Sequence, residues 1–339
     1  LRFRKRKAAV TGDVSMAYNG VCLAPDHFKY QQFLWKDELN PSSQTTVWII
    51  RTLIYGIRSS GNQTAAGFEI LADFCSKNHP EHAKGAEALK SDTYVDDILV
   101  SCDTPEDCRK IADDIDFTLS LGSMSVKAYT FSGTAPDEKV SADGVHVGVV
   151  GYLWDPVKDT LTLDIKELYL DKPKRGRLPD IITGDFSEAL KEKFTRRVLT
   201  SKVSGIYDPL GLLTPLTAMM KLDLHAVCKL GLDWDDKVPD EHLGQWVANL
   251  KIIQTLRDIP FRRSIVPINA VSPKLDVIVS VDASEKIAIA AVHARTLCLD
   301  GTYHCQLLTA KSKIVSGSTT PRAELKAALT GATLGHIVK

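Results

Sequence analysis

The first part of the chain alternates short apolar stretches with amphipathic ones. Residues 8–13 form an apolar strand that ends in an aspartate, and another apolar run occupies residues 98–100. Residues 60–77 place small and apolar side chains at helical spacing. A further helix is expected at 104–121, because Thr104 suits a helix cap and is followed by proline and acids. The order strand, helix, hairpin, helix, strand predicts an antiparallel sheet backed by helices.

After residue 160 the pattern becomes mainly helical. Residues 160–165 alternate as a strand, residues 172–179 have the composition of a linker, and residues 187–203 have the apolar spacing of a helix. Another helix is predicted from Leu216 to about Lys229. We expect the core of this region to contain two tryptophans, Trp234 and Trp246.

The end of the chain has the pattern of three strands followed by a helix. The strands are expected at 275–284, 287–294 and 306–315, and Thr320-Pro321 opens a helix with Glu324 on its buried side. The whole pattern predicts an α+β protein. Its units are expected at residues 1–160, 161–265 and 266–339.

Composition narrows the class of protein. Of 339 residues, 44% are apolar and 25% charged, which suffices for sizeable cores. No apolar run approaches the roughly 18 residues of a membrane span, and the basic N-terminus does not resemble a secretion signal. Seven cysteines without a Cys-x-x-Cys pair fit reduced thiols. We therefore expect a cytoplasmic protein, neither secreted nor membrane-bound.

Charge gives only a local signal. The 42 basic residues equal the 42 acidic ones, so the net charge neither requires nor excludes nucleic acid. Basic residues cluster near the N-terminus and again in the expected linker, where each cluster could contact phosphates or be a solvated strand end or linker. The clusters are Arg2, Arg4, Lys5, Arg6 and Lys7, and then Lys172, Lys174, Arg175 and Arg177. For the second cluster the solvated linker is favoured.

The most informative motif is Tyr94-Val95-Asp96-Asp97, an acidic pair between residues that suit strands. This pattern predicts a tight hairpin with both carboxylates at its tip. Adjacent anions repel each other, and hard oxygen ligands favour Mg²⁺ or Mn²⁺, so the motif suggests a metal site. The alternative is an acidic surface turn, since aspartate favours turns in any protein.

A second acidic position favours the metal site over the acidic surface turn. Asp13 ends its strand, and the aromatic Tyr18 follows five residues later. With these motifs in this order, the chain resembles a reverse transcriptase of the BEL/Pao class of long-terminal-repeat retrotransposons over nearly its whole length. The resemblance implies a polymerase palm in residues 1–160, a helical thumb and connection in 161–265, and part of a ribonuclease H-like domain in 266–339.

The resemblance also assigns roles to particular residues. It implies that Asp13, Asp96 and Asp97 are the catalytic, metal-binding carboxylates, and that Tyr18 excludes a 2′-hydroxyl on the incoming nucleotide. The loop and helix start at 51–62 would pack against template and nucleotide, with Gly56 and Ser60 as nucleotide-binding residues. Residues 147–154 resemble the primer-grip hairpin. The implied partners are an RNA or DNA template, a primer and deoxynucleoside triphosphates, with two Mg²⁺ or Mn²⁺ ions as cofactors.

The chemistry explains these residue types. Phosphoryl transfer needs an in-line attack and neutralisation of developing charge, which two metal ions bridged by carboxylates provide. Asp13 and Asp96 would be the bridging ligands, with Asp97 as the lesser partner. Lys127 could be a general acid toward pyrophosphate or a solvated residue of an amphipathic strand, and the two readings stay equally open.

The second half carries two further motifs. Residues 202–215 resemble a hallmark of the Pao class that often bears a peptidase label, but neither Asp-Thr-Gly nor Asp-Ser-Gly occurs in the chain, so we interpret it as structural. Asp282 and Glu324 would be the first ribonuclease H ligands, or else plain strand-end and first-turn acids. The remaining ligands of such a site are expected beyond Lys339, and most of the fingers before Leu1. The spacing of His293, Cys298, His304 and Cys305 matches no standard zinc finger, which favours ordinary strand residues.

Other functions remain as alternatives to an active polymerase. One is a nucleic-acid-binding relic that has lost catalysis, which would bind primer–template without taking up metal. Another is a peptidase, for which Asp208 would be essential. The last is an unrelated metal-dependent phosphotransferase acting on small nucleotides without a template.

Overall fold

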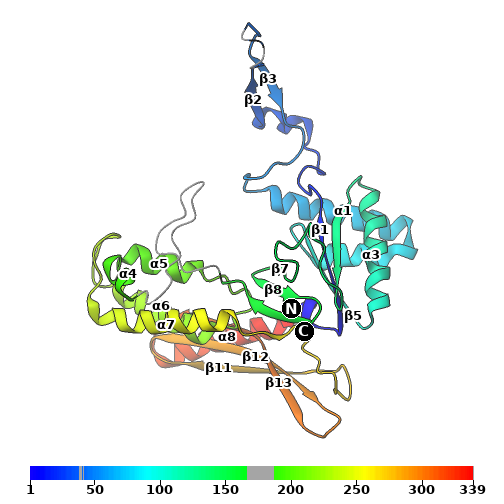
Figure 1. The fold of residues 1–339 in the computed structure, drawn as a ribbon. Coiled ribbons are helices and arrows are strands. Elements are labelled where there is room, and N and C mark those ends of the chain that lie inside the picture. Colours follow the sequence, from blue (N-terminus) through cyan, green and yellow to red (C-terminus); the bar gives the residue numbers. More distant parts are fainter. Residues whose placement is uncertain (38–39, 41, 166–186, 339) are drawn as a thin grey trace.

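The computed structural model describes residues 1–37, 40, 42–165 and 187–338. It is an α+β structure in which separate antiparallel sheets follow one another along the chain (Figure 1). The linker predicted at 172–179, with its basic cluster, lies outside the described residues. Short 3₁₀ helices join several elements: η1 (Arg2–Arg4), η2 (Pro25–Tyr30), η3 (Pro80–His82) and η4 (Asp240–His242).

The first sheet confirms the prediction of strands backed by helices. Its strand order is β4-β5-β1-β6. Val10, Ile98 and Val100 alternate toward the helices and share a buried cluster with Phe68 and Ile115. The strands are β1 (Ala8–Val14), β4 (Thr93–Tyr94), β5 (Asp97–Cys102) and β6 (Val126–Phe131), and the helices are α1 (Ser60–Asn78), α2 (Ala83–Ser91) and α3 (Pro105–Ser120). The other face of this sheet is therefore not covered by these helices.

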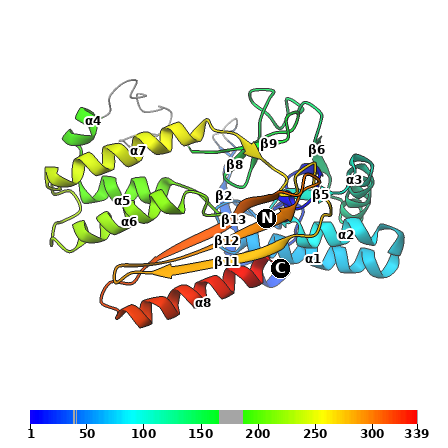
Figure 2. The ribbon, with the colours of Figure 1, turned by 90° about the horizontal axis from the view of Figure 1, so that it is seen from below.

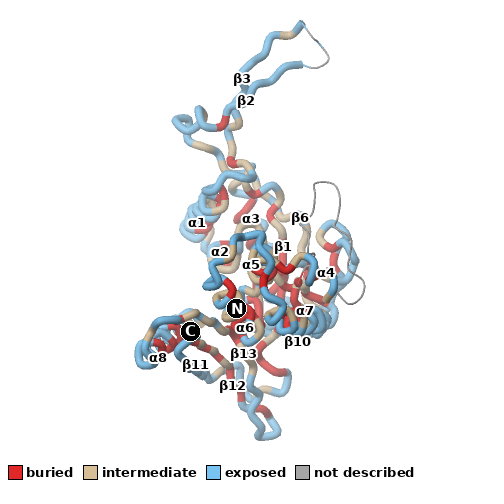
Figure 3. Tube along the Cα trace, turned by 90° about the vertical axis from the view of Figure 1, so that its left-hand side faces the viewer, coloured by how far each residue is buried: buried red, intermediate tan, exposed pale blue. Residues whose placement is uncertain are grey.

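A two-stranded hairpin extends away from this sheet (Figure 1). It consists of β2 (Gln32–Trp35) and β3 (Thr46–Ile49), and all of its strand residues are exposed. The sequence pattern did not predict it. Figure 3 shows the contrast between this exposed hairpin and the buried strands of the body.

The second sheet contains the predicted primer-grip hairpin and the strand predicted at 160–165. Its order is β10-β9-β8-β7, with β7 (Val147–Val149), β8 (Tyr152–Asp155), β9 (Thr160–Leu163) and β10 (Phe261–Arg262). The boundary expected at residue 160 falls inside this sheet. Because β10 comes from residues 261–262, segments about a hundred residues apart complete one sheet.

The helical region packs directly on the second sheet. It contains α4 (Ser187–Glu192), α5 (Arg196–Gly205), α6 (Thr214–Cys228) and α7 (Leu243–Arg257). Leu199, Met220 and Trp246 share one buried cluster with Trp154 and Val147 of the sheet. The hairpin of β7 and β8, which the sequence analysis predicts to be a primer grip, is therefore held by the helices.

Two predictions for this region were wrong. The single helix expected at 187–203 is two helices, because the Thr195 hydroxyl accepts a hydrogen bond from the Val198 amide and starts α5 afresh. Trp234 is 46% exposed rather than buried. The Arg196 guanidinium lies 4.5 Å from its ring centroid, so this indole forms a cation–π contact at the surface.

The C-terminal sheet and its helix form where predicted (Figure 2). The strand order is β11-β12-β13, with β11 (Asp276–Ala283), β12 (Ile287–Leu297) and β13 (Tyr303–Ile314), and α8 (Thr320–Val338) packs on β11 and β12. Glu324 is exposed, contrary to prediction. The buried stripe of α8 passes through Ala323 and Ala327, and one residue further on turns Glu324 away from it.

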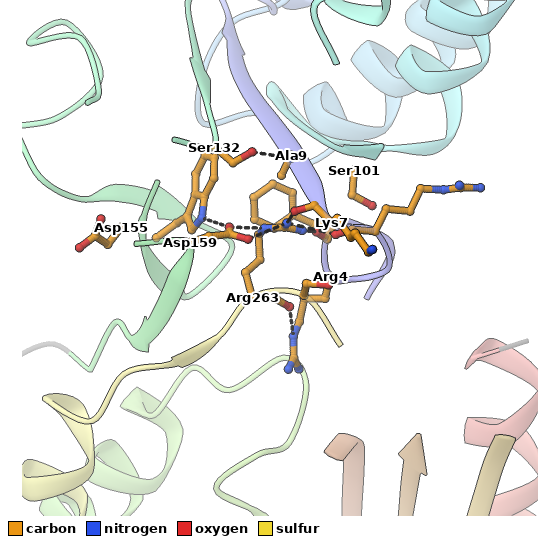
Figure 4. Close-up of polar contacts among 12 residues, drawn as sticks. Arg4, Lys7, Ala9, Ser101, Ser132, Asp155, Asp159 and Arg263 are labelled. Carbon is orange, nitrogen blue, oxygen red and sulfur yellow. Dashed lines mark hydrogen bonds and ion pairs between the residues drawn. The ribbon is translucent and has the colours of Figure 1, made fainter. Parts of the chain in front are cut away.

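A buried arginine ties the N-terminal segment to the second sheet (Figure 4). Arg263 is fully buried, and its Nε and Nη2 donate to the Asp159 carboxylate at 2.6 and 2.9 Å. The same guanidinium donates to the backbone carbonyls of Phe3 and Lys7. Each of the three nitrogens of this planar cation therefore has an acceptor.

Candidate active site

The predicted acidic hairpin is present at the end of the first sheet. Tyr94 pairs with Asp97 across a turn formed by Val95 and Asp96, and Val95 has φ of 61°. On the other side of β5, Asp97 lies directly opposite Asp13 of β1. Directly opposed residues in an antiparallel pair project to the same face, so these two carboxylates lie side by side.

The third carboxylate belongs to the same site electrostatically. Repulsion by Asp96 raises the pKa of both Asp13 and Asp97, in each case after the larger effect of desolvation. For Asp97, burial together with repulsion from Asp96 and Asp13 raises the pKa to about 6. The Lys127 ammonium partly offsets the rise at Asp13. The structure therefore brings together the three predicted aspartates and the predicted lysine.

Two of these three aspartates, Asp13 and Asp97, border a cavity of about 300 Å³. Asp13, Asp97 and Lys127 line it together with Val147 and Gly148 of the primer-grip hairpin. It also contains Lys139, from the loop between β6 and β7, which the sequence analysis did not single out. No local pattern could have identified Lys139, because only the folded loop brings it beside the aspartates.

The residues predicted to bind nucleotide lie at the start of α1. Tyr18 contacts Tyr55 edge to face, with ring centroids 4.6 Å apart. Gly56 has φ of 90° in an open loop. Ser60 is buried, and its hydroxyl donates to the Ile54 carbonyl at 2.8 Å. Tyr18 is thus partly exposed and Gly56 exposed, whereas the Ser60 side chain holds the loop.

The donor set suits a hard divalent cation. Within the described part of the chain, no group of three or more His, Cys, Asp or Glu side chains is already arranged around an ion position. Mg²⁺ is usually held by one or two carboxylates, with substrate phosphates and water completing its shell. The opposed pair Asp13 and Asp97, with Asp96 nearby, fits that incomplete protein contribution.

The predicted ribonuclease H-like acids are placed differently. Asp282, near the end of β11, and Glu324, in the first turn of α8, are both exposed. Among the described residues, neither of them belongs to a group of three or more His, Cys, Asp or Glu side chains that could hold a metal ion. Their assignment as ribonuclease H ligands remains a prediction.

Asp208, the residue that a peptidase would require, is hydrogen-bonded to groups of the protein itself. Its carboxylate accepts hydrogen bonds from the Tyr152 hydroxyl at 3.0 Å and from the amides of Leu212 and Leu213 at 3.0 and 2.7 Å. These donors fix it to the primer-grip hairpin and to the start of α6. A carboxylate held in this way is a helix-start anchor rather than an acid poised for peptide hydrolysis.

The residues around Asp208 join three parts of the molecule, and we call residues 207–211 the junction segment. Tyr207 lies near Tyr94 of the acidic hairpin, and this neighbour raises the pKa of Tyr207. The Ala310 amide of β13 donates to the Leu210 carbonyl at 3.0 Å. The junction segment thus contacts the acidic hairpin, the primer-grip hairpin and the C-terminal sheet.

In the C-terminal half, a helical region leads into an antiparallel three-stranded sheet with a covering helix. Residues 195–339 match the family model described as the Pao retrotransposon-like RNaseH-like domain. This part of the chain is therefore similar to that family, and the resemblance to a Pao-class retrotransposon is confirmed. The match spans the boundary expected near residue 265. No curated protein sequence matches the chain.

Membrane insertion has no support in the helices. None of those in the described part of the chain combines the length and apolarity needed to cross a bilayer.

The palm assignment of residues 1–160 and the roles of its residues remain predictions.

Proposed function

We propose that this chain is part of an RNA-directed DNA polymerase of a Pao-class retrotransposon, extending a primer by two-metal nucleotidyl transfer. The observation that carries the proposal is the pairing of Asp13 with Asp97 across neighbouring strands, with Asp96 at the adjoining turn. Desolvated carboxylates that raise one another's pKa form a site that is stabilised by added cations.

Each part of the site has a task in this proposal. Asp13 and Asp96 would hold two Mg²⁺ or Mn²⁺ ions, with Asp97 as the lesser ligand. When bound, such ions supply neutralisation of the charge that develops on the transferred phosphoryl group. The primer-grip hairpin at β7 and β8 would position the primer end, and Tyr18 would contact the sugar of the incoming nucleotide.

The partners follow from the reaction: an RNA or DNA template, a primer with a free 3′-hydroxyl, and deoxynucleoside triphosphates. The N-terminal basic cluster is only partly available to phosphates, because Arg4 is buried and Arg2 and Arg6 pair with Asp92 and Asp103. A cytoplasmic location belongs to the same proposal.

The decisive test is Mg²⁺-dependent extension of a DNA primer on an RNA template. We expect Asp96→Asn to reduce extension by roughly 100-fold or more, the scale on which one electrostatic stabiliser of a transition state is felt. Asp103→Asn makes the same change at the far end of β5 and is expected to retain extension. Equal activity of the two variants would contradict the proposal.

A catalytically inactive nucleic-acid-binding relic is the second candidate. Retained duplex binding with no extension by the unmodified chain would support this candidate instead.

A further inference from the structure

The cavity beside the aspartates is lined by lysines as well as carboxylates. Lys127 reaches it from β6, and Lys139 reaches it from the loop before β7. Asp13 and Asp97 line the same cavity. Its wall therefore presents two cations and two anions within about 300 Å³.

The loop that carries Lys139 is fixed by its own hydrogen bonds. The Asp137 carboxylate accepts from the Lys139 amide at 2.8 Å, and the Asp137 carbonyl accepts from the Val140 and Ser141 amides. Further along, the Asp143 carboxylate accepts from the Val145 and His146 amides at 2.8 and 2.7 Å. The backbone position of Lys139 is therefore set by two successive aspartate turns.

One more contact ties this loop to the second sheet. The Gly133 amide donates to the Pro156 carbonyl at 2.8 Å, and Ser141 is buried. The loop thus keeps its place relative to both the first sheet and the primer-grip hairpin. Lys139 is presented to the cavity by a fixed backbone.

Among the described residues, no side-chain hydrogen bond and no ion pair within 4.0 Å is recorded for Lys139 or Lys127, and Lys127 acts on Asp13 only by longer-range attraction. Carboxylates in the same cavity attract divalent cations, and free ammonium groups attract phosphate oxygens. A metal-bound polyphosphate or phosphodiester carries both complementary charges. We propose that Lys139 is a second phosphate-binding residue of this site, acting beside Lys127; the inference rests on the proposed function.

The phosphate has two sources that share this chemistry. One is the triphosphate of the incoming nucleotide, and the other is the backbone phosphate next to the primer end, since Val147 and Gly148 of the primer-grip hairpin line the same cavity. Both are tested by exchanging the lysine for a neutral side chain of similar length.

The experiment compares the unmodified chain with Lys139→Gln, Lys139→Arg and the matched control Lys110→Gln. Lys110 is an exposed lysine on α3, a helix that packs on the other face of the first sheet. Binding is measured with Ca²⁺ in place of Mg²⁺, by calorimetry for inorganic tripolyphosphate and a deoxynucleoside triphosphate, and by fluorescence anisotropy for labelled primer–template over a salt series.

We expect Lys139→Gln to lower the affinity for one of these ligands by about fivefold or more. The affinities of Lys139→Arg and Lys110→Gln are expected to stay within about twofold of that of the unmodified chain. Weaker triphosphate binding alone identifies the nucleotide as the source. Weaker duplex binding, with the salt dependence reduced by about one charge, identifies the primer phosphate. Unchanged affinity for both ligands overturns the role of Lys139.

The same data separate this inference from the proposed polymerase. If the unmodified chain binds phosphate ligands through Lys139 but does not extend a primer, the proposed polymerase activity is rejected and the proposed role of Lys139 is supported. If it extends a primer and Lys139→Gln changes neither affinity, only the lysine site fails. An unmodified chain that binds neither ligand overturns both.

Discussion

Folding brings the carboxylates at the ends of β1 and β5 close together, so they repel one another in the native state. In the unfolded chain Asp97 has the ordinary pKa of an aspartate, whereas in the fold burial and its acidic neighbours raise that pKa to about 6. Between these two values the native state binds more protons than the unfolded state. The free energy of unfolding therefore falls as pH rises from about 4 to 7.

This residue-scale argument predicts that Asp97→Asn stabilises the protein at neutral pH. The gain is expected to be about 1–2 kcal/mol at pH 7.5 and to vanish near pH 4, because the variant lacks the buried charge. Urea unfolding at both pH values measures it. A variant that is less stable than the unmodified chain at pH 7.5 would show that Asp97 has a compensating partner.

The sequence motifs and the family resemblance that they carry were enough to select the aspartates and Lys127 as candidates. They were not enough for Ser60, whose buried hydroxyl holds Ile54 of the preceding loop. Nor could they indicate Lys139, whose relation to Asp13 depends on how β6, β7 and their loop fold together. A side chain's accessibility is a property of its neighbours, which lie elsewhere in the sequence.

At the scale of elements, the junction segment depends on a glycine. Gly211 has φ of 72°, and a Cβ built there would lie 1.9 Å from the Ala310 carbonyl oxygen of β13. Any larger residue must therefore displace the junction segment from the C-terminal sheet. Gly231 has the same φ of 72° but no atom within 4 Å of an added Cβ.

The pair gives a matched prediction. Gly231→Ala should cost about 1 kcal/mol, the price of a left-handed backbone for alanine. Gly211→Ala should cost about 2 kcal/mol or more beyond that, because backbone atoms must also move. Denaturant unfolding gives the stabilities, and hydrogen exchange in β13 reports its docking. Equal costs for the two variants would mean that this contact is not tight in solution.

Most elements of this molecule follow from local pattern, including α1, α3, the acidic hairpin and β11 to β13. The exceptions have identifiable causes. Thr195 interrupts the predicted helix at 187–203 through a side-chain cap, and Trp234 finds an arginine partner at the surface instead of a core. The helix start at Thr195 and the surface position of Trp234 both depend on which competing contact is available. The spacing of apolar residues carries no information about such contacts.

For the molecule as a whole, Arg263 links segments that are far apart in sequence. Its buried guanidinium joins Asp159 to the carbonyls of the N-terminal segment. Removing it would leave these carbonyls without this donor, and the Asp159 carboxylate would keep only its hydrogen bond from the Trp154 indole among the described residues. We expect Arg263→Ala to destabilise the protein by about 3–5 kcal/mol, as for other half-removed buried ion pairs.

The matched control is Arg295→Ala, which removes an arginine from an exposed pair with Asp276. Screening by water makes such pairs weak, so little change in unfolding is expected. Thermal and urea unfolding of both variants provide the comparison. A similar small effect at both positions would show that the N-terminal segment is not held by Arg263.

The sequence by itself determined the α+β class, the order of most strands and helices, and the acidic residues of the candidate site. These follow from short-range physics: side-chain period, helix caps, turn chemistry and the residue types that carry charge. Only the tertiary structure decided that residues 147–163 and 261–262 share one sheet, that Asp208 anchors a junction, and that Lys139 lies beside the aspartates. Those contacts join residues distant in sequence, and their geometry is fixed only when the intervening elements pack.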